Sequence, residues 1–160
     1  MRINLLIGGK AGQGINKVTG IITKAIIEHG YFIFNYRDYP SIIRGGHNFN
    51  IISISDRPIR SHESRMDGII ALDGETRRLH EDELKKGGFV IDYSEFPGLG
   101  INLNIALCGA LMRRLGIEKE NLLDSVKEGL KDKDSLKEAI VAAKQGYESQ
   151  ETRYHLRKLK

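Results

Sequence analysis

The sequence predicts an α/β fold: a three-layer, Rossmann-like domain with a mainly parallel sheet and helices on both faces. Three successive observations support this prediction. An apolar run at residues 3–7 ends in two glycines, as a buried strand does where it enters a loop. From Ile15, apolar residues recur at the three-and-four spacing of an amphipathic helix. Residues 31–36 are aromatic and β-branched, which favours a second strand. Such a strand–helix–strand unit indicates parallel strands joined by a right-handed crossover.

The rest of the chain continues in the same manner, without internal repeats or a linker. Further strands are predicted from their apolar runs at residues 49–55, 68–72 and 89–92. Helices are predicted at residues 76–86, where two glycines should end the helix, and at 102–115, 121–130 and 135–147. A length of 160 residues suits a single domain. We expect this domain over residues 1–150, followed by a basic tail over residues 151–160.

The net charge of +4 is concentrated at the end of the chain. Residues 151–160 hold four basic side chains and one acidic side chain, a net of +3. A nucleic-acid surface needs a basic stripe interleaved with aromatic residues, and because no such stripe appears we expect no nucleic-acid partner. No run of 18 apolar residues occurs, and the apolar start is too short for a signal peptide. We therefore predict a cytoplasmic protein that does not contact a membrane.

Cys108 is the one cysteine of the sequence. An iron–sulfur cluster needs about four thiolates, so any such centre would have to sit on another chain. Cys108 lies in an apolar helical stretch, which favours an inert core thiol. The histidines show no metal-ligand spacing with one another or with acidic residues, and no nucleophile motif appears. We therefore predict no metal site and no catalytic residue in this chain.

A glycine-rich loop, Gly-Gly-Lys-Ala-Gly-Gln-Gly, joins the first strand to the first helix. Glycines permit a tight turn and let backbone N–H groups approach an anion at the helix N-terminus. The loop departs from the dinucleotide fingerprint, because a lysine stands at the third glycine position, and it lacks the lysine and hydroxyl of the ATPase phosphate loop. The candidate binding residues are Gly8, Gly9, Gly12, Gln13 and Gly14. The alternative is a turn that serves only packing and an interface.

A second candidate segment follows the second predicted strand and contains Arg44, Gly45, Gly46, His47 and Asn48. Arginine offers a rigid fork for carboxylate or phosphate, and adjacent glycines leave room for a ligand or a partner backbone. Arg44 is thus a candidate anion contact at an active-site edge or a subunit seam. The alternative is a salt bridge to one of the domain's own aspartates. His47 is a candidate general base, although a lone loop histidine is more often a structural hydrogen-bonding group.

Together these motifs resemble those of the gamma subunit, or gamma-type domain, of 2-oxoacid:ferredoxin oxidoreductases. The glycine loop is similar to the family's first turn. Residues 36–48 are similar to its second signature, most closely in forms where this domain is fused ahead of the alpha subunit. Residues 66–73, 84–92 and 104–111 resemble its later segments. The resemblance covers residues 3–117 well and the last helices loosely.

Two positions depart from the family pattern. Between Asp92 and Asn104 the chain is shorter than the family usually is, which puts one edge strand and its interface in doubt. Ala139 stands where many members have an asparagine. The shorter segment is consistent with a divergent relative that has a changed partner or substrate.

The resemblance implies a subunit of an enzyme that oxidatively decarboxylates a 2-oxoacid to an acyl-CoA and reduces ferredoxin. In that family, alpha and beta subunits hold thiamine diphosphate, and beta or delta subunits hold iron–sulfur clusters. The implied partners are the alpha and beta subunits, a delta subunit as a further candidate, and ferredoxin through the complex. This chain would hold no cofactor by itself, would line part of the coenzyme A approach, and would be inactive alone. The alternatives are a stand-alone Rossmann-type nucleotide-binding module and a non-catalytic assembly scaffold.

Two expectations about arrangement follow. The two candidate loops leave the carboxyl ends of strands that we expect to be parallel neighbours, so both should lie on one edge of the domain. Family domains bury large surfaces against partner subunits, and exposed apolar patches tend to pair. We therefore expect the isolated chain to form a homodimer or a weak oligomer.

Overall fold

The computed structural model describes residues 1–39, 46–130 and 133–159. Most of the strands come early in the chain, and three helices close it. The strands are β1 (Arg2–Lys10), β2 (Phe32–Asp38), β3 (His47–Ser55), β4 (Met66–Ala71) and β5 (Leu84–Asp92). The helices are α1 (Ile15–Glu28), α2 (Gly74–His80), α3 (Leu103–Leu115), α4 (Lys119–Gly129) and α5 (Lys133–Glu148).

The strands form one sheet in the order β2-β3-β1-β4-β5. β4 is parallel to both β1 and β5, whereas β3 is antiparallel to both β1 and β2. β2 therefore runs in the same direction as β1, and four of the five described strands share one direction. The predicted α/β fold is confirmed, with one difference: the sheet is mixed, because β3 is inserted between β1 and β2. The apolar run at residues 49–55 predicted a strand here, but it carries no information about the direction of that strand.

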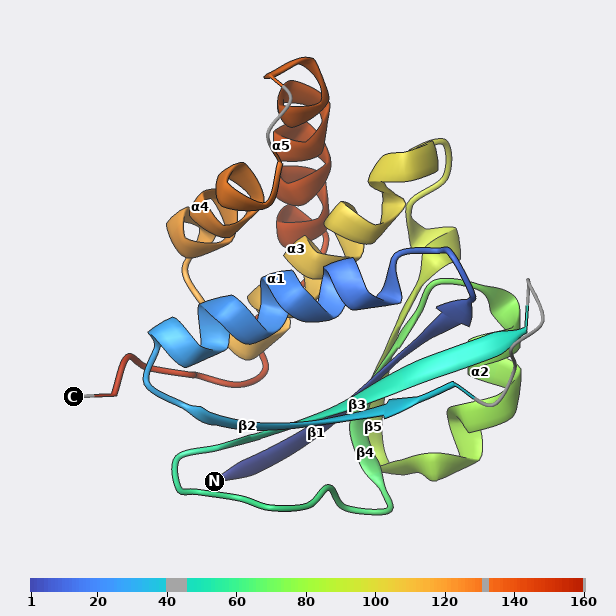
Figure 1. Ribbon diagram of the computed structural model, residues 1–160, viewed down its shortest axis with the longest axis vertical. Coiled ribbons are helices and arrows are strands. Elements are labelled where there is room, and N and C mark those ends of the chain that lie inside the picture. The colour runs from blue at the N-terminus through green and yellow to red at the C-terminus, as the bar shows by residue number, and fades with distance from the viewer. Residues whose placement is uncertain (40–45, 131–132, 160) are drawn as a thin grey trace.

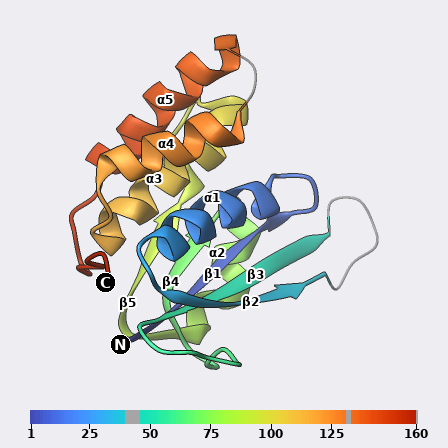
Figure 2. The same ribbon diagram turned by 60° about the vertical axis from the view of Figure 1, so that its left-hand side comes forward.

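Helices cover both faces of the sheet. Figure 1 shows α1 lying across one face, with α3, α4 and α5 packed beyond it, and Figure 2 shows the same stack of helices from a second direction. α2 lies against the opposite face, where Thr76 approaches Gly8 and the ring of His80 meets that of Phe49. We call these the α1 face and the α2 face of the sheet.

The core follows the alternation of side chains along β1. Ile3, Leu5 and Ile7 are buried on the α1 face, where they belong to the larger apolar cluster with α1 and α3. Leu6 points the other way and belongs to a smaller cluster on the α2 face with Ile51 and residues of β4. Because both faces of β1 are buried, its sequence is a continuous apolar run rather than an alternating one.

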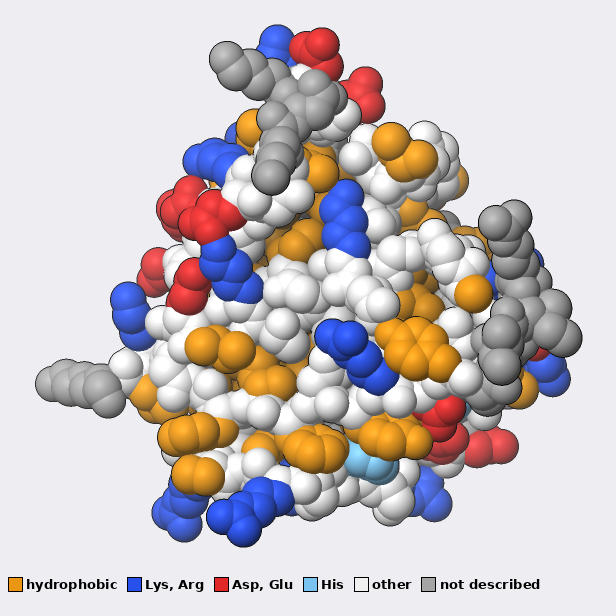
Figure 3. Space-filling model, viewed as in Figure 1, with side chains coloured by type: hydrophobic (Ala, Val, Ile, Leu, Met, Phe, Trp, Pro, Cys, Tyr) orange, Lys and Arg blue, Asp and Glu red, His pale blue; other side chains and the backbone are white. Residues whose placement is uncertain are grey.

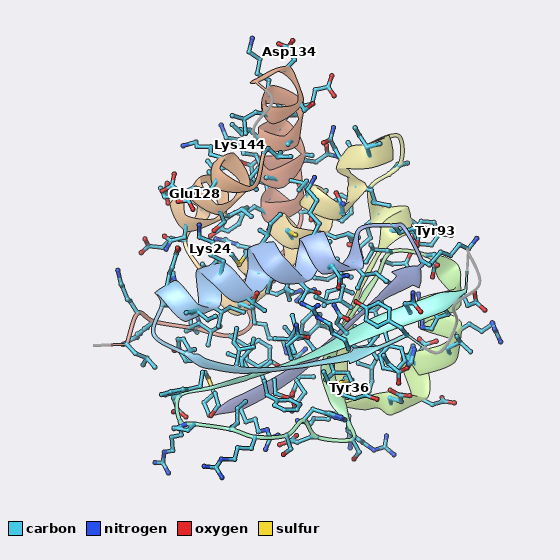
Figure 4. All side chains as sticks on the ribbon, in the orientation of Figure 1. Lys24, Tyr36, Tyr93, Glu128, Asp134 and Lys144 are labelled. Atoms are coloured by element: carbon cyan, nitrogen blue, oxygen red, sulfur yellow. The ribbon has the colours of Figure 1, made fainter. Side chains whose placement is uncertain are left out.

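The outer helices are fixed by close contacts. The backbones of α3 and α5 approach so closely that a Cβ on Gly109 would collide with the carbonyl oxygen of Ala143, and one on Gly146 would collide with that of Ala106. An ion pair between Lys24 and Glu128 joins α1 to α4, and Figure 4 shows the two side chains facing each other. Glycine is therefore a packing requirement on both sides of the α3–α5 contact.

The predicted helix over residues 76–86 is wrong at both ends. α2 begins earlier because Asp73 caps it, its Oδ1 atom accepting a hydrogen bond from Thr76 N. The helix ends at His80, followed by a short 3-10 turn, and residues 84–88 belong to β5. The two glycines expected to end the helix lie inside the strand, where Gly87 has a φ of 77° and β4 and β5 shift register. Polar composition did not distinguish an irregular edge strand from an exposed helix.

The described part of the basic tail lies along the domain. Its backbone donates hydrogen bonds to the end of α3, from Tyr154 N to Arg114 O over 2.8 Å and from Leu156 N to Leu115 O over 3.0 Å. The Leu156 side chain is 1% exposed. In the part of the chain that the structure describes, no helix combines the length and the apolar character needed to cross a bilayer.

Candidate functional site

The carboxyl end of β1 lies where the strand order reverses. The crossover through α1 leads from β1 to β2 on one side, whereas β4 and β5 lie on the other side. In open α/β sheets, ligands bind in the crevice beyond the carboxyl ends of the strands at such a reversal. The segments that leave β1 and β4 meet there, and Leu72 N donates to Gly8 O over 2.9 Å. Topology therefore marks this crevice as the candidate site.

The crevice contains a hollow of about 410 Å³, which we call the crevice hollow. Its walls come from the glycine loop, the first turn of α1, the end of β4 and the turn that begins α3. The lining residues are Gly12, Gln13, Gly14, Lys17, Leu72, Gly100, Ile101, Leu103 and Asn104. Three residues predicted from the sequence, Gly12, Gln13 and Gly14, are among them.

Packing accounts for Gly8 and Gly9. A Cβ on Gly8 would lie 2.5 Å from Thr76 Cγ2 on the α2 face. A Cβ on Gly9 would lie 2.6 Å from Gln13 Oε1 and 2.9 Å from Leu72 Cβ. At these two positions glycine lets neighbouring groups close on the end of β1, in agreement with the packing alternative.

The tip of the loop is open instead. Gly12 and Gly14 have φ values of 94° and 84°, a region that favours glycine. A Cβ on Gly12 would meet nothing within 4 Å, so the backbone there faces free space. Gly14 is the N-cap of α1, with no side-chain cap and no acidic residue in the first turn. The first N–H groups of α1 and its dipole therefore favour an anion at this end.

Gln13 closes the loop that it belongs to. Its Oε1 atom accepts a hydrogen bond from Lys10 N at 2.6 Å, and its own N–H donates to Lys10 O at 3.0 Å. These bonds hold the backbone in the turn that presents Gly12 and Gly14. The side-chain acceptor of Gln13 is thus already used within the loop.

Lys17 and Asn104 complete the crevice hollow, and neither was predicted as a binding residue. Lys17 is exposed on the first turn of α1. Asn104 Oδ1 is buried and has no hydrogen-bond partner among the described residues, and Asn104 Nδ2 lies 2.7 Å from where a Cβ of Gly14 would be. In the sequence, Asn104 opens the last motif of the family resemblance, and Lys17 occupies the third glycine position of the dinucleotide fingerprint. These two features are the signals in the sequence by which Asn104 and Lys17 could have been identified as site residues.

The second candidate segment lies partly at the same edge. Ala11 N donates to Gly46 O over 3.0 Å, and His47 and Asn48 pair with Lys10 and Gly9 at the end of β1. Gly46, His47 and Asn48 therefore adjoin the glycine loop. Arg44 and Gly45 lie outside the described residues, so the predicted position of the guanidinium stays a prediction.

His47 lies on the α2 face, with the end of β1 between it and the crevice hollow. Its Nε2 atom is 2.8 Å from Nε2 of His80, and Nδ1 of His80 is 3.2 Å from Oε1 of Glu83. Burial lowers the pKa of His47, and the neighbouring His80 lowers it further, against opposing effects of Asp73 and Glu75. The arrangement favours a neutral imidazole held by structural hydrogen bonds.

Cys108 is fully buried in α3. Burial raises the pKa of its thiol to about 12, so the nucleophilic thiolate is scarce at neutral pH. This geometry agrees with an inert core thiol. Over residues 1–39, 46–130 and 133–159, no three His, Cys, Asp or Glu side chains are grouped so that they could hold a metal ion.

The strand order and the crevice place the chain among the open α/β sheets, the class of domains that bind ligands beyond the carboxyl ends of their strands. Residues 4–102 match the model of the family described as pyruvate ferredoxin/flavodoxin oxidoreductase, which is more than half of the chain. The chain belongs to this family.

Curated relatives are alpha subunits of 2-oxoacid:ferredoxin oxidoreductases. The chain is 36% identical over 85 residues to that of a Sulfolobus species, a match covering 53% of this chain and 13% of the alpha subunit. It is 29% identical over 123 residues to subunit alpha of oxidoreductase 2 from Aeropyrum pernix, covering 77% and 18%. The chain thus spans less than a fifth of the length of these relatives. This agrees with the predicted resemblance to forms that carry the domain within the alpha subunit.

Solved structures share the fold. The 2-oxoglutarate:ferredoxin oxidoreductase of Magnetococcus marinus, determined with 2-oxoglutarate, coenzyme A and succinyl-CoA bound, matches with a TM-score of 0.83 at 17% identity, over 99% of this chain and 33% of that one. The gamma subunit of a keto/oxoacid ferredoxin oxidoreductase from Geobacter sulfurreducens matches with a TM-score of 0.75 at 22% identity, over 92% and 95%. The pyruvate oxidoreductase subunit PORC of Thermotoga maritima gives 0.68 at 16% identity, over 92% and 96%.

Proposed function

We propose that the chain works as the gamma-type subunit of a 2-oxoacid:ferredoxin oxidoreductase, in which a 2-oxoacid is oxidatively decarboxylated to an acyl-CoA and ferredoxin is reduced. Its partners in this proposal are alpha and beta subunits, with a delta subunit as a further candidate, and ferredoxin reached through the complex. We further propose that the crevice hollow receives a phosphate-bearing group, with coenzyme A the first candidate. A cytoplasmic location stays a prediction.

The observation that carries the second proposal is the set of groups around the crevice hollow. The uncapped N-terminus of α1 and the ammonium group of Lys17 suit phosphate oxygens. Asn104 Oδ1, buried without a partner among the described residues, needs a donor. A phosphate ester that also carries hydroxyl or amide N–H groups satisfies both requirements, and coenzyme A has this chemistry.

The other groups implied by the family fit this chain less well. Thiamine diphosphate also bears phosphates, but a diphosphate-bound magnesium ion is usually held by one or two protein carboxylates, and no Asp or Glu is among the residues that line the crevice hollow. An iron–sulfur cluster needs about four thiolates, and the chain has one cysteine, which is buried. We therefore assign thiamine diphosphate and the clusters to the partner subunits.

The test uses the chain assembled with its alpha and beta partners. We expect Lys17→Ala to raise the KM for coenzyme A about tenfold or more, since a charge-assisted hydrogen bond contributes roughly 1.5–3 kcal/mol. Gly12→Val should raise it further by filling the open loop tip. Lys144→Ala, which removes an exposed lysine of α5, is the matched control and should leave the KM unchanged.

The outcomes separate the alternatives. An unchanged KM for coenzyme A in Lys17→Ala contradicts the proposed site, and a raised thiamine diphosphate requirement instead reassigns it. Tight binding of ADP to the isolated chain, measured by calorimetry, would favour the stand-alone nucleotide-binding module. Failure of the chain to co-purify with alpha and beta subunits would contradict the role of a gamma-type subunit altogether.

A further inference from the structure

The basic tail closes one side of a second hollow, at the end of α1 that is remote from the crevice hollow. Its backbone donates to the ends of two helices, from Leu159 N to His29 O over 2.8 Å and from Leu156 N to Leu115 O over 3.0 Å. Figures 1 and 2 show this segment passing the ends of α1 and α3. α1 begins beside the glycine loop and its 14 residues extend about 21 Å, so the two hollows are separate sites.

This second hollow, which we call the tail hollow, has a volume of about 320 Å³, within the range of sites for small ligands. Its walls are formed by the end of α1, the connection between α3 and α4, and the basic tail. The polar side chains that line it are His29, Glu118, Asn121, Arg157 and Lys158. The lining therefore combines two basic groups, one acidic group, an amide and an imidazole.

His29 is the buried polar group of the tail hollow. It is 5% exposed, and its Nδ1 atom lies 3.0 Å from Ala25 O. Because a carbonyl oxygen can only accept, Nδ1 carries a proton, and Nε2 is the nitrogen left for other contacts. Nε2 has no hydrogen-bond partner among the described residues. A neutral Nε2 accepts from an O–H group, whereas a protonated Nε2 donates to an anion.

The N-terminus of α4 lies at the same hollow. Its N-cap, Glu118, makes no side-chain capping bond, and the first N–H with a helical partner is that of Leu122, which donates to Glu118 O over 3.4 Å. The N–H groups of residues 119–121 therefore have no helical acceptor. The acidic residue of this first turn, Glu120, is exposed and does not line the hollow. Free N–H groups at the positive end of a helix favour an anion.

Arg157 and Lys158 bring positive charge that the domain itself does not use. Neither side chain forms an ion pair or a hydrogen bond with another described residue, Glu118 included. The last carbonyls of α3 already accept backbone N–H groups of the tail, so the two cations are not needed there as hydrogen-bond donors. On the face seen in Figure 3, acidic and basic side chains are interspersed over α4 and the end of α1. The excess of donors and positive charge is thus local to the tail hollow.

We propose that the tail hollow binds the phosphate group of a small phosphate monoester. The N–H groups of α4, the guanidinium of Arg157 and the ammonium of Lys158 contact the phosphate oxygens. Near neutral pH a fraction of a monoester keeps one P–O–H group, which donates to a neutral His29 Nε2, and its ionised oxygens accept from a protonated ring. Sulfate has no O–H to offer at this pH, so His29 favours phosphate. The inference does not rest on the proposed enzymatic role.

The first test titrates the full chain with inorganic phosphate and follows each site by NMR. We expect the signals of the His29 ring and of the backbone amides of residues 119–121 to shift together, with one dissociation constant. The amides of Gly12 and Gly14 report the crevice hollow separately, so failure of the tail hollow and failure of the proposed function are distinguishable.

The matched variants remove two charges each. Arg157→Ala combined with Lys158→Ala should raise the dissociation constant measured at His29 about tenfold or more, since contacts of charged groups with phosphate are the strong ones. Lys86→Ala combined with Lys144→Ala removes the same charge from exposed positions of β5 and α5 and should leave the constant unchanged. Circular dichroism confirms that each variant is folded.

Two further ligands test the chemical class. Sulfate should bind about tenfold more weakly than phosphate, because it offers no O–H to His29 Nε2. Glycerol 3-phosphate should bind at least as tightly as inorganic phosphate, since the hollow has room for the rest of a small ester. Equal binding of sulfate, or binding of inorganic phosphate without binding of the ester, would overturn the assignment. So would shifts confined to the glycine loop, or a dissociation constant that is indifferent to the substitutions in the tail.

Discussion

The Nε2 atoms of His47 and His80 lie 2.8 Å apart, so one imidazole must donate the proton that the other accepts. Glu83 lies beside Nδ1 of His80 and favours a proton on that nitrogen. His80 Nε2 is then the acceptor and His47 Nε2 the donor. Protonation of both rings would set two donors against each other between β3 and α2.

This pair predicts a loss of stability in mild acid. The pKa of His47 is lowered in the folded chain, mainly by burial and then by His80, despite Asp73 and Glu75. The unfolded chain therefore binds the proton more readily, and stability is complete above about pH 6.5 and falls as the pH drops below it. His47→Phe, which cannot titrate, should lose less melting temperature between pH 7 and pH 5 than the unchanged chain. His155→Phe, at an exposed histidine, is the control, and an equal loss in His47→Phe contradicts the assignment.

The contact between α3 and α5 predicts a sharp contrast between two glycines. Gly146→Val would drive a side chain into the backbone of Ala106 and should lower the free energy of unfolding by about 3 kcal/mol, at the upper end of overpacking effects. Gly20 lies inside α1, with nothing within 4 Å of an added Cβ and no positive φ. Gly20→Ala should therefore raise the free energy of unfolding by about 0.5–1 kcal/mol. Urea unfolding measures both, and equal effects would refute the close contact.

Periodicity predicted most of the elements because it reports local burial. The run from Ile3 to Ile7 and the three-and-four pattern from Ile15 correspond to β1 and α1 within a few residues. Direction and pairing are not local. Nothing in the residues of β3 indicates that this strand is inserted, antiparallel, between β1 and β2. Its neighbours and its direction depend on pairing with residues that are distant in the sequence. Gly87 and Gly88 were misread as the end of a helix because the local sequence does not show that they lie in a strand paired with β4.

The candidate site was predicted in part, for a similar reason. The glycine loop carries its signal in consecutive residues, so Gly12 and Gly14 were found. Lys17 and Asn104 face one hollow only because α1 and α3 start at the same edge of the sheet, a relation that spacing in the sequence does not express. Conversely, His47 was grouped with the loop by position but lies on the α2 face, paired with His80.

Cys108 should be unreactive in the folded chain. Its thiol is fully buried, and burial raises its pKa to about 12. We expect its reaction with a thiol reagent at pH 7.5 to be at least a hundredfold slower in buffer than in concentrated guanidinium chloride, because modification requires local or global opening. Rapid labelling of the folded chain, with circular dichroism unchanged, would show that α3 opens readily.

The last prediction concerns activity without partners. The chain supplies the crevice hollow, but its one cysteine is buried and its described residues group no three metal-binding side chains, so the electron-transfer groups belong to other subunits in the proposed enzyme. We expect no 2-oxoacid-dependent reduction of a viologen dye by the purified chain with coenzyme A and thiamine diphosphate. Added alpha and beta subunits should give activity that depends on the amount of this chain and saturates at a fixed subunit ratio. Turnover by the chain alone, or full activity of alpha and beta without it, would each contradict the proposed division of labour.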